Sequence, residues 1–65
     1  MKYPNITAVP NDGNAFAILG AVGKALKRAG VDKAEVDAFY AEATAGDYEH
    51  LKATARKWVN AELED

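Results

Sequence analysis

The sequence predicts a mainly α-helical fold, in which three short helices form a compact bundle with an extended N-terminal arm or short β-strand. The chain has 65 residues, of which 49% are apolar, and its glycines and prolines divide it into four pieces. Alanine, the residue with the highest helix propensity, is abundant. Because a chain of this length holds only one small core, we expect a single domain over residues 1–65.

The first piece, residues 3–10, is expected to be the extended arm or strand. Pro4 and Pro10 flank a run from Ile6 to Val9 whose β-branched side chains favour extended backbone. Because proline has no amide donor, this segment suits a short edge strand. A single strand is not stable alone, so it must pack on the helices or pair with the same strand of another chain.

The second piece is predicted to be a helix at about residues 14–29. Gly30 follows it at the position of a C-terminal cap. Apolar residues recur in this helix at intervals of three or four and give it a wide buried face. They are Phe16, Leu19, Val22 and Leu26.

Two further helices are predicted at about residues 33–45 and 48–62. Asp32 and Glu35 have the spacing of a capping box at the start of the earlier one, and Gly46 ends it. Asp47 is expected to cap the later one, and Trp58 continues its buried face.

Small residues on the first predicted helix indicate close packing. Glycine inside a helix costs up to ~1 kcal/mol relative to alanine, so Gly20 and Gly23 call for a packing reason. Either Tyr40 or Trp58 of the same chain fills the space, or the helix of a second copy approaches it. Since small cores rarely supply more than ~3–5 kcal/mol, we expect a homo-oligomer, and specifically a dimer. Its expected contacts are Ala17, Gly20, Ala21, Ile6 and Val9.

A binding site for an anion or nucleotide is a further expectation. Gly13 and Asn14 open the first predicted helix, where free amides suit a phosphate, although an ordinary turn and cap is the favoured explanation of these two residues. Lys24, Lys27 and Arg28 gather near the other end of that helix. Cations there complement the helix dipole, and they are also candidates for contacting an anion.

Composition excludes several classes of function. The chain contains no serine and no cysteine, so hydrolases that use either nucleophile are excluded, and we expect neither an enzyme nor a cofactor. His50 is the only histidine, and with Asp47 and Glu49 it does not form a metal-ligand pattern. A net charge of −2 makes nucleic acid an unexpected partner, although residues 33–62 leave a helix-turn-helix-like regulator open as an alternative.

Localisation follows from two further absences. No apolar segment of a signal peptide follows the N-terminal residues, and no run approaches the roughly 20 apolar residues of a membrane span. We therefore expect no membrane contact and a location in the cytoplasm of a bacterial host cell. That host is implied by the resemblance described next.

Four stretches resemble a family of very small proteins encoded by phages, prophages and other bacterial mobile elements. The stretches are Tyr3–Asn5, Asp12–Gly20, Gly46–Leu51 and Trp58-Val59, and they are distributed over nearly the whole length of the chain. Members tend to have more arginine in the second half of the first helix. This chain instead has Ala21-Val22-Gly23-Lys24 there. The resemblance implies a mobile-element context and no particular activity or catalytic residue.

Together these observations predict a small non-enzymatic binding protein that acts stoichiometrically, as a homo-oligomer, on a bacterial host protein, including a counter-defence role. Tyr3 lies on the arm, where its aromatic ring is expected to contact the partner. The alternative is a protein that sequesters a nucleotide or cyclic-oligonucleotide signal. Both rest on size, surface pattern and mobile-element context, which is an argument by analogy.

Overall fold

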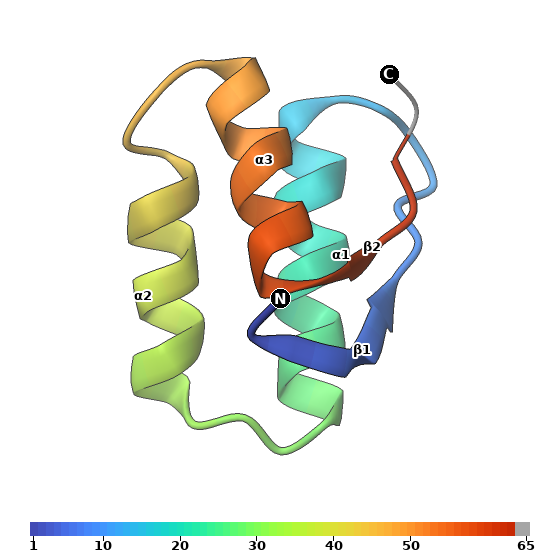
Figure 1. The fold of residues 1–65 in the computed structure, drawn as a ribbon, viewed down its shortest axis with the longest axis vertical. Coiled ribbons are helices and arrows are strands. Elements are labelled where there is room, and N and C mark those ends of the chain that lie inside the picture. The colour runs from blue at the N-terminus through green and yellow to red at the C-terminus, as the bar shows by residue number, and fades with distance from the viewer. Residues whose placement is uncertain (64–65) are drawn as a thin grey trace.

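The computed structural model describes residues 1–63 of the chain. Its elements in order are β1 (Tyr3–Ala8), α1 (Ala15–Arg28), α2 (Lys33–Ala43), α3 (Tyr48–Trp58) and β2 (Val59–Ala61). Consecutive helices run in opposite directions (Figure 1). The mainly α-helical class with a short N-terminal strand, predicted from the sequence, is confirmed.

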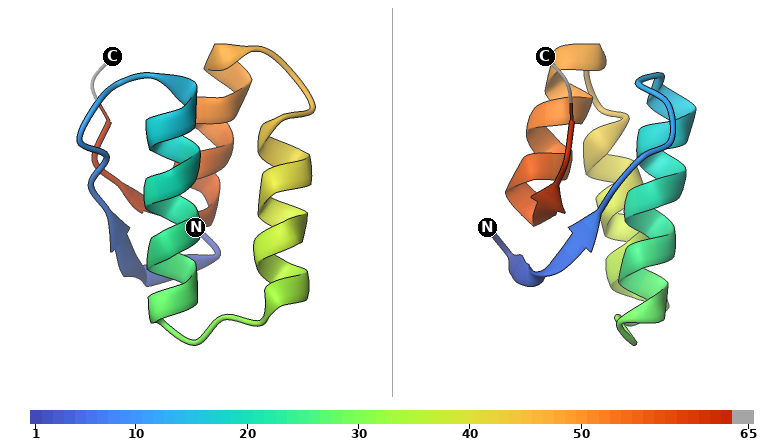
Figure 2. Two further views of the ribbon diagram at one scale, coloured as in Figure 1. Left: turned by 180° about the vertical axis from the view of Figure 1, so that it is seen from behind. Right: turned by 90° about the vertical axis from the view of Figure 1, so that its right-hand side faces the viewer.

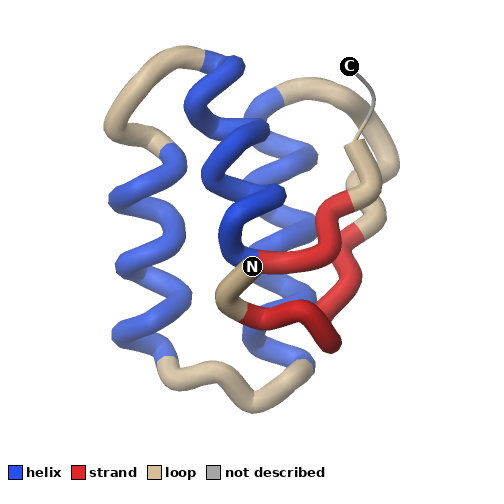
Figure 3. Tube along the Cα trace, viewed as in Figure 1, coloured by secondary structure: helices blue, strands red, loops and turns tan. Residues whose placement is uncertain are grey.

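The two strands form a small parallel sheet beside α1 and α3, on the side away from α2 (Figure 3). Thr7 aligns with Asn60 and Ala8 with Ala61. Between Tyr3 and Thr7 the register shifts, because β1 has more residues there than β2. The arm therefore pairs within its own chain, which was one of the two arrangements that the sequence left open.

The predicted third helix, 48–62, is wrong at its C-terminal end. Helix α3 stops at Trp58, and the next three residues form β2 instead. Val59 is β-branched and fully buried, and extended backbone there lets β2 pair with β1. The other helices are also slightly shorter than predicted, since α1 ends at Arg28 and α2 at Ala43.

The C-terminus of α1 ends in a Schellman motif. Gly30 has a φ of 83°, a left-handed conformation that glycine adopts without a steric penalty. Its amide donates to the carbonyl of Lys27, and the amide of Val31 donates to the carbonyl of Leu26, both at 3.0 Å. The predicted cap at Gly30 is confirmed, and the motif turns the chain toward α2.

The two predicted N-terminal signals of α2 and α3 have different outcomes. Asp47 caps α3, because its Oδ1 accepts from the amide of His50 at 2.9 Å. The capping box at the start of α2 is wrong, because the Asp32 side chain makes no cap hydrogen bond. The Glu35 carboxylate instead binds Lys2 and Tyr3 of the N-terminal segment.

The core lies where the three helices meet the sheet. Its largest fully buried side chains are Phe39, Ile18, Leu26, Val22, Val36 and Val59, and Trp58 joins them. Phe16 was predicted to face this core, but it is 86% exposed. It precedes Ile18 by two residues, or about 200° of helix rotation, and Ile18 takes the buried position.

Within residues 1–63, no helix is long and apolar enough to cross a membrane.

Candidate functional site

A groove runs between β1 and one face of α1, and we call it the β1–α1 groove. It has a volume of ≈ 840 Å³. Residues 5–9 and Asn11 line it from the strand side. From the helix side it is lined by Ala17, Gly20, Ala21, Lys24, Ala25, Arg28 and Ala29. The right-hand view of Figure 2 shows β1 beside α1 and inclined to the axis of the helix.

Small side chains form the floor of the groove. Ala17, Ala21 and Ala25 are half-buried and follow one another at intervals of four residues along α1. Ile6 and Val9 line the same groove from the strand side. The structure thus brings together all the residues that the sequence predicted for self-association, although it holds a single chain.

The two interior glycines of α1 have different surroundings. A Cβ atom added at Gly23 would lie 1.8 Å from the Tyr40 hydroxyl oxygen, so the tyrosine ring fills that space. A Cβ atom added at Gly20 would have nothing within 4 Å. The Tyr40 ring of the same chain therefore explains Gly23, which was one of the two interpretations of the sequence. The surface at Gly20 is left open.

Two basic side chains lie at the edge of the β1–α1 groove. Lys24 and Arg28 are exposed, lie one helical turn apart and line it. Neither forms an ion pair with any other residue of the described segment 1–63. Lys27, the third member of the predicted basic cluster, is exposed and is not among the lining residues.

The strand edge at the groove has unused backbone groups. The Ala8 carbonyl accepts from the Glu62 amide at 2.9 Å, so the Ala8 peptide groups point toward β2. Because backbone groups alternate in direction along a strand, those of Thr7 point to the opposite edge. The sheet has only two strands in the part of the chain that is described, and no strand covers that edge.

The predicted anion site is not assembled as expected. Asn14 caps α1, its Oδ1 accepting from the Ala17 amide at 2.8 Å, and its own amide donates to Asp12 at 3.1 Å. The Gly13 carbonyl accepts from the Tyr48 hydroxyl. The 14 residues of α1 place this cap about 20 Å from Lys27 and Arg28. Gly13 and Asn14 therefore form a turn and cap, while Lys24 and Arg28 belong to the groove.

Tyr3 is also placed differently from its prediction. The Tyr3 hydroxyl donates to Glu35 Oε1 at 2.8 Å, and its ring centroid lies 6.1 Å from that of Trp58. The hydrogen bond to the carboxylate raises the pKa of Tyr3. Lys2 reaches the same Glu35 oxygen at 2.7 Å, and this contact, followed by the one from Tyr3, lowers the pKa of Glu35. Tyr3 thus anchors β1 to α2 and does not lie on a free arm.

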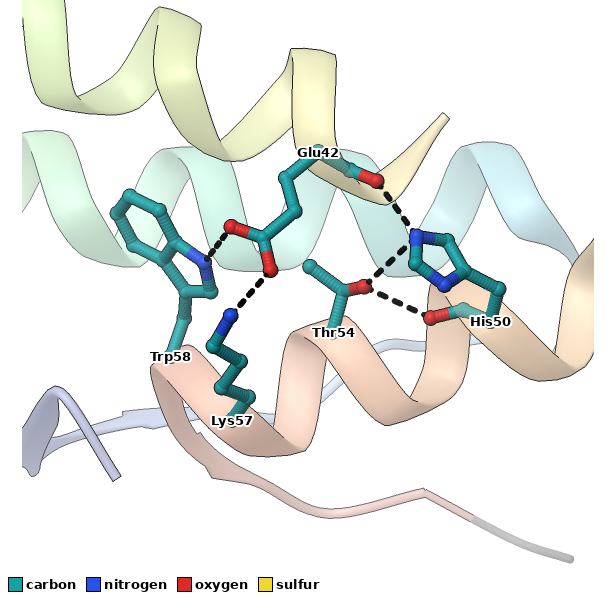
Figure 4. Close-up of polar contacts among 5 residues, drawn as sticks. All are labelled: Glu42, His50, Thr54, Lys57 and Trp58. Atoms are coloured by element: carbon teal, nitrogen blue, oxygen red, sulfur yellow. Dashed lines mark hydrogen bonds and ion pairs between the residues drawn. The ribbon is translucent and has the colours of Figure 1, made fainter. Parts of the chain in front are cut away.

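Glu42 organises the opposite side of the molecule, between α2 and α3 (Figure 4). Its Oε2 lies 2.6 Å from Lys57 Nζ, and its Oε1 accepts from the Trp58 indole at 3.2 Å. The contact with Lys57 is the main reason why the pKa of Glu42 is lowered. Both carboxylate oxygens are therefore used within the fold.

His50 continues this network. Its Nε2 lies 2.8 Å from the Glu42 carbonyl oxygen, which only accepts, so Nε2 carries the proton. The Thr54 hydroxyl donates to the His50 carbonyl at 2.8 Å. Residues 1–63 contain no group of three histidine, aspartate or glutamate side chains arranged to hold a metal ion. The contacts of His50 link α3 to the end of α2.

Part of the groove was not predicted from the sequence. Asn5 and Thr7 line it and were not singled out, and neither were Ala25 and Ala29. Ala25 and Ala29 follow Ala21 at intervals of four residues, and this spacing could have indicated them.

Comparisons with protein-family models, with curated proteins and with solved structures give no match. The function must therefore be inferred from the geometry.

Proposed function

We propose that this chain is a non-enzymatic binding protein that acts stoichiometrically, as a homo-oligomer, on a bacterial host protein. The observation that carries the proposal is the β1–α1 groove, an open surface made from a free strand edge and a helix face of small residues. Its lining contains neither a carboxylate nor a histidine, so it offers no acid–base pair. Such a surface favours binding over catalysis.

Self-association is supported by two residues on α1. Phe16 is 86% exposed, and Gly20, one turn further along the helix, leaves open space beside it. When two copies of α1 cross in antiparallel directions, each Phe16 can lie over the partner's Gly20. Such a contact is two-fold symmetric and self-complementary, as in most homodimers. It uses the N-terminal half of α1 and leaves Lys24 and Arg28 accessible.

The bacterial setting of the proposal rests on the sequence resemblance to proteins of mobile elements. Small proteins of that kind often act by occupying a host protein or by sequestering a host signal, and a defence component is the class of target that we propose. This part is an argument by analogy of context. The groove supports the binding, and the resemblance supports only the proposal that the host is bacterial.

Native mass spectrometry tests the proposal. We expect the purified wild-type protein to be a homodimer and to retain a host protein at fixed stoichiometry when it is isolated gently from a bacterial host. Gly20→Trp should be monomeric, because the new ring occupies the space that Phe16 of the second copy needs. Ala38→Trp, which introduces the same ring at an exposed position of α2, should remain dimeric. A wild-type monomer without any retained protein would contradict the proposal.

A second candidate function is sequestration of a nucleotide or cyclic-oligonucleotide signal. Lys24 and Arg28 favour it, because they are two cations without a described acidic partner at a groove of ≈ 840 Å³. That volume is within the roughly 300–1,000 Å³ of small-molecule pockets. Calorimetry with linear and cyclic nucleotides should give heat that Lys24→Gln abolishes and Lys27→Gln preserves. No heat with any of them would exclude this candidate.

A further inference from the structure

We propose that the partner inserts an extended acidic segment into the β1–α1 groove, where the segment adds as a strand to the free edge of β1. This inference rests on the proposed binding function and defines the chemistry of the partner. It commits to a protein segment with carboxylates on alternate residues. Three features of the groove support it: the strand edge, the charges and the floor.

The strand edge supplies the backbone recognition. Thr7 turns its amide and carbonyl away from β2, and no described strand covers that side. An uncovered edge accepts an extended peptide through main-chain hydrogen bonds, a mode known as β-augmentation. Pro10 limits the available edge to a few residues, so a short segment is sufficient.

The distribution of charge selects an acidic segment. Every lysine outside α1 forms an ion pair with a carboxylate of this chain. The pairs are Lys2–Glu35, Lys33–Asp37, Lys52–Glu49 and Lys57–Glu42. Lys24 and Arg28 at the groove have no such partner in residues 1–63. An acidic ligand is therefore the complement that this surface lacks.

The spacing of the cations fits alternate residues of a strand. Lys24 and Arg28 are four residues apart, which is about 6 Å along a helix. Side chains on the same face of a strand are about 6.6 Å apart. The long side chains of lysine and arginine can accommodate the inclination of β1 to the axis of α1 (Figure 2). Two carboxylates of one bound strand can thus meet both cations at once.

The floor of small residues leaves room for the segment. Ala21 and Ala25 of α1 line the groove opposite residues 5–9 of the strand side, and their methyl groups are the smallest side chains after glycine. The aliphatic carbons of glutamate side chains can pack on these alanines while their carboxylates reach the cations. A larger residue on this face would block the inserted strand.

Fluorescence anisotropy with a defined peptide tests the acidic chemistry. The probe is a labelled, end-blocked peptide of three Val-Glu repeats, and its comparison peptide has glutamine in place of glutamate. We expect the glutamine peptide to bind the wild-type protein at least roughly tenfold more weakly than the probe does. The variant Lys24→Glu should lose affinity for the original probe by a similar factor. Lys27→Glu makes the same charge change outside the groove and should bind within about twofold of wild type. Equal binding of both peptides would overturn the inference.

Strand addition is tested separately. Thr7→Pro removes the outward amide while leaving the backbone groups of Ala8 for β2, and it should abolish binding of the probe. A probe N-methylated at alternate residues loses the same hydrogen bonds from its own side, and it leaves the protein unchanged. We expect one of the two alternate methylation patterns to prevent binding. Full binding of both methylated probes would overturn strand addition.

The two proposals fail in distinguishable ways. If the dimer retains a host protein but the acidic probe does not bind, the binding function stands and the acidic segment is wrong. If nucleotides bind in a Lys24-dependent manner and the probe does not, the second candidate function replaces this inference. Binding of the probe at residues 5–9 and at Lys24, mapped by NMR shifts, supports it.

Discussion

The two sides of the molecule use their polar groups differently. On the α2–α3 side, Glu42 binds both Lys57 and Trp58, and Glu35 binds Lys2 and Tyr3. On the β1–α1 side, the cations at the groove have no acidic partner in residues 1–63, and one strand edge is uncovered. The first side is satisfied by the chain itself, whereas the second offers groups to another molecule.

This difference separates stability from binding within 65 residues. A domain of this size has little stability to spare, since its core supplies only about 3–5 kcal/mol. The fold therefore places its hydrogen-bonded carboxylates and its aromatic cluster together, around Trp58. Changes on that side should unfold the protein, and changes on the groove side should leave it folded.

The largest effect is expected at Trp58. Its ring is 3% exposed and lies 5.6 Å from the ring of Phe39, between centroids. Trp58→Ala should cost about 3–5 kcal/mol, which is comparable to the whole stability of the domain. Circular dichroism should then show a largely unfolded chain at room temperature.

Val9→Ala is the matched control on the groove side. It shortens a groove-lining side chain that is 64% exposed, so the free energy of unfolding should change by less than about 0.5 kcal/mol. Urea titration of both variants measures this comparison. If Val9→Ala unfolds the chain, or Trp58→Ala does not, the assignment of the two sides is wrong.

The next effect distinguishes the two glycines of α1. In Gly23→Ala the new methyl group would overlap the Tyr40 ring, and we expect a loss of about 1–3 kcal/mol. Gly20→Ala places its methyl group in open space, so helix propensity should stabilise it by up to about 1 kcal/mol. Thermal denaturation of the two variants should therefore shift in opposite directions.

A double-mutant cycle identifies the cause. In a Tyr40→Ala background the ring is gone, so the loss from Gly23→Ala should disappear. The effect of Gly20→Ala should be the same with or without the ring. A loss at Gly23 that persists without Tyr40 would point to a backbone cause and contradict our interpretation of the packing.

The smallest effect is the pH dependence of the α2–α3 side. Lys57 lowers the pKa of Glu42 below its ordinary 4.5, so this carboxylate stabilises the fold above pH 4.5. The contribution is lost as the pH falls through the lowered pKa. Glu42→Gln should therefore melt at a lower temperature than wild type at pH 7. At a pH below the lowered pKa, where Glu42 is protonated and neutral like glutamine, the two proteins should melt at the same temperature. Lys24→Gln should follow the wild-type curve, and a constant gap for Glu42→Gln would contradict the linkage.

Local sequence signals predicted most of the fold. Gly30 and Asp47 act at the positions that their residue types indicated, because a left-handed turn and a helix cap depend on neighbouring backbone alone. Val59 shows the limit of this approach. Its helical environment looked continuous, and only pairing with a strand far away in the sequence ended the helix there.

The candidate site was predicted in part for the same reason. The small face of α1 could be recognised from helical spacing, and Lys24 was named as a possible ligand-binding residue. The sequence could not show which residues at the two ends of α1 lie beside β1. Gly13 and Asn14 were therefore grouped with cations that lie at the other end of the helix.

Pairing between β1 and β2 also sets an order of events in folding. Thr7 and Asn60 are 53 residues apart in the sequence, so closing this pair brings together segments from the two extremes of the described chain. Helices with local contacts form faster than such long-range pairs, and we expect the sheet to close last. Until residues 59–61 are in place, β1 has no strand to hold it beside α1. The groove therefore comes into existence only at the final step of folding, and a nascent chain that lacks β2 cannot engage a partner early.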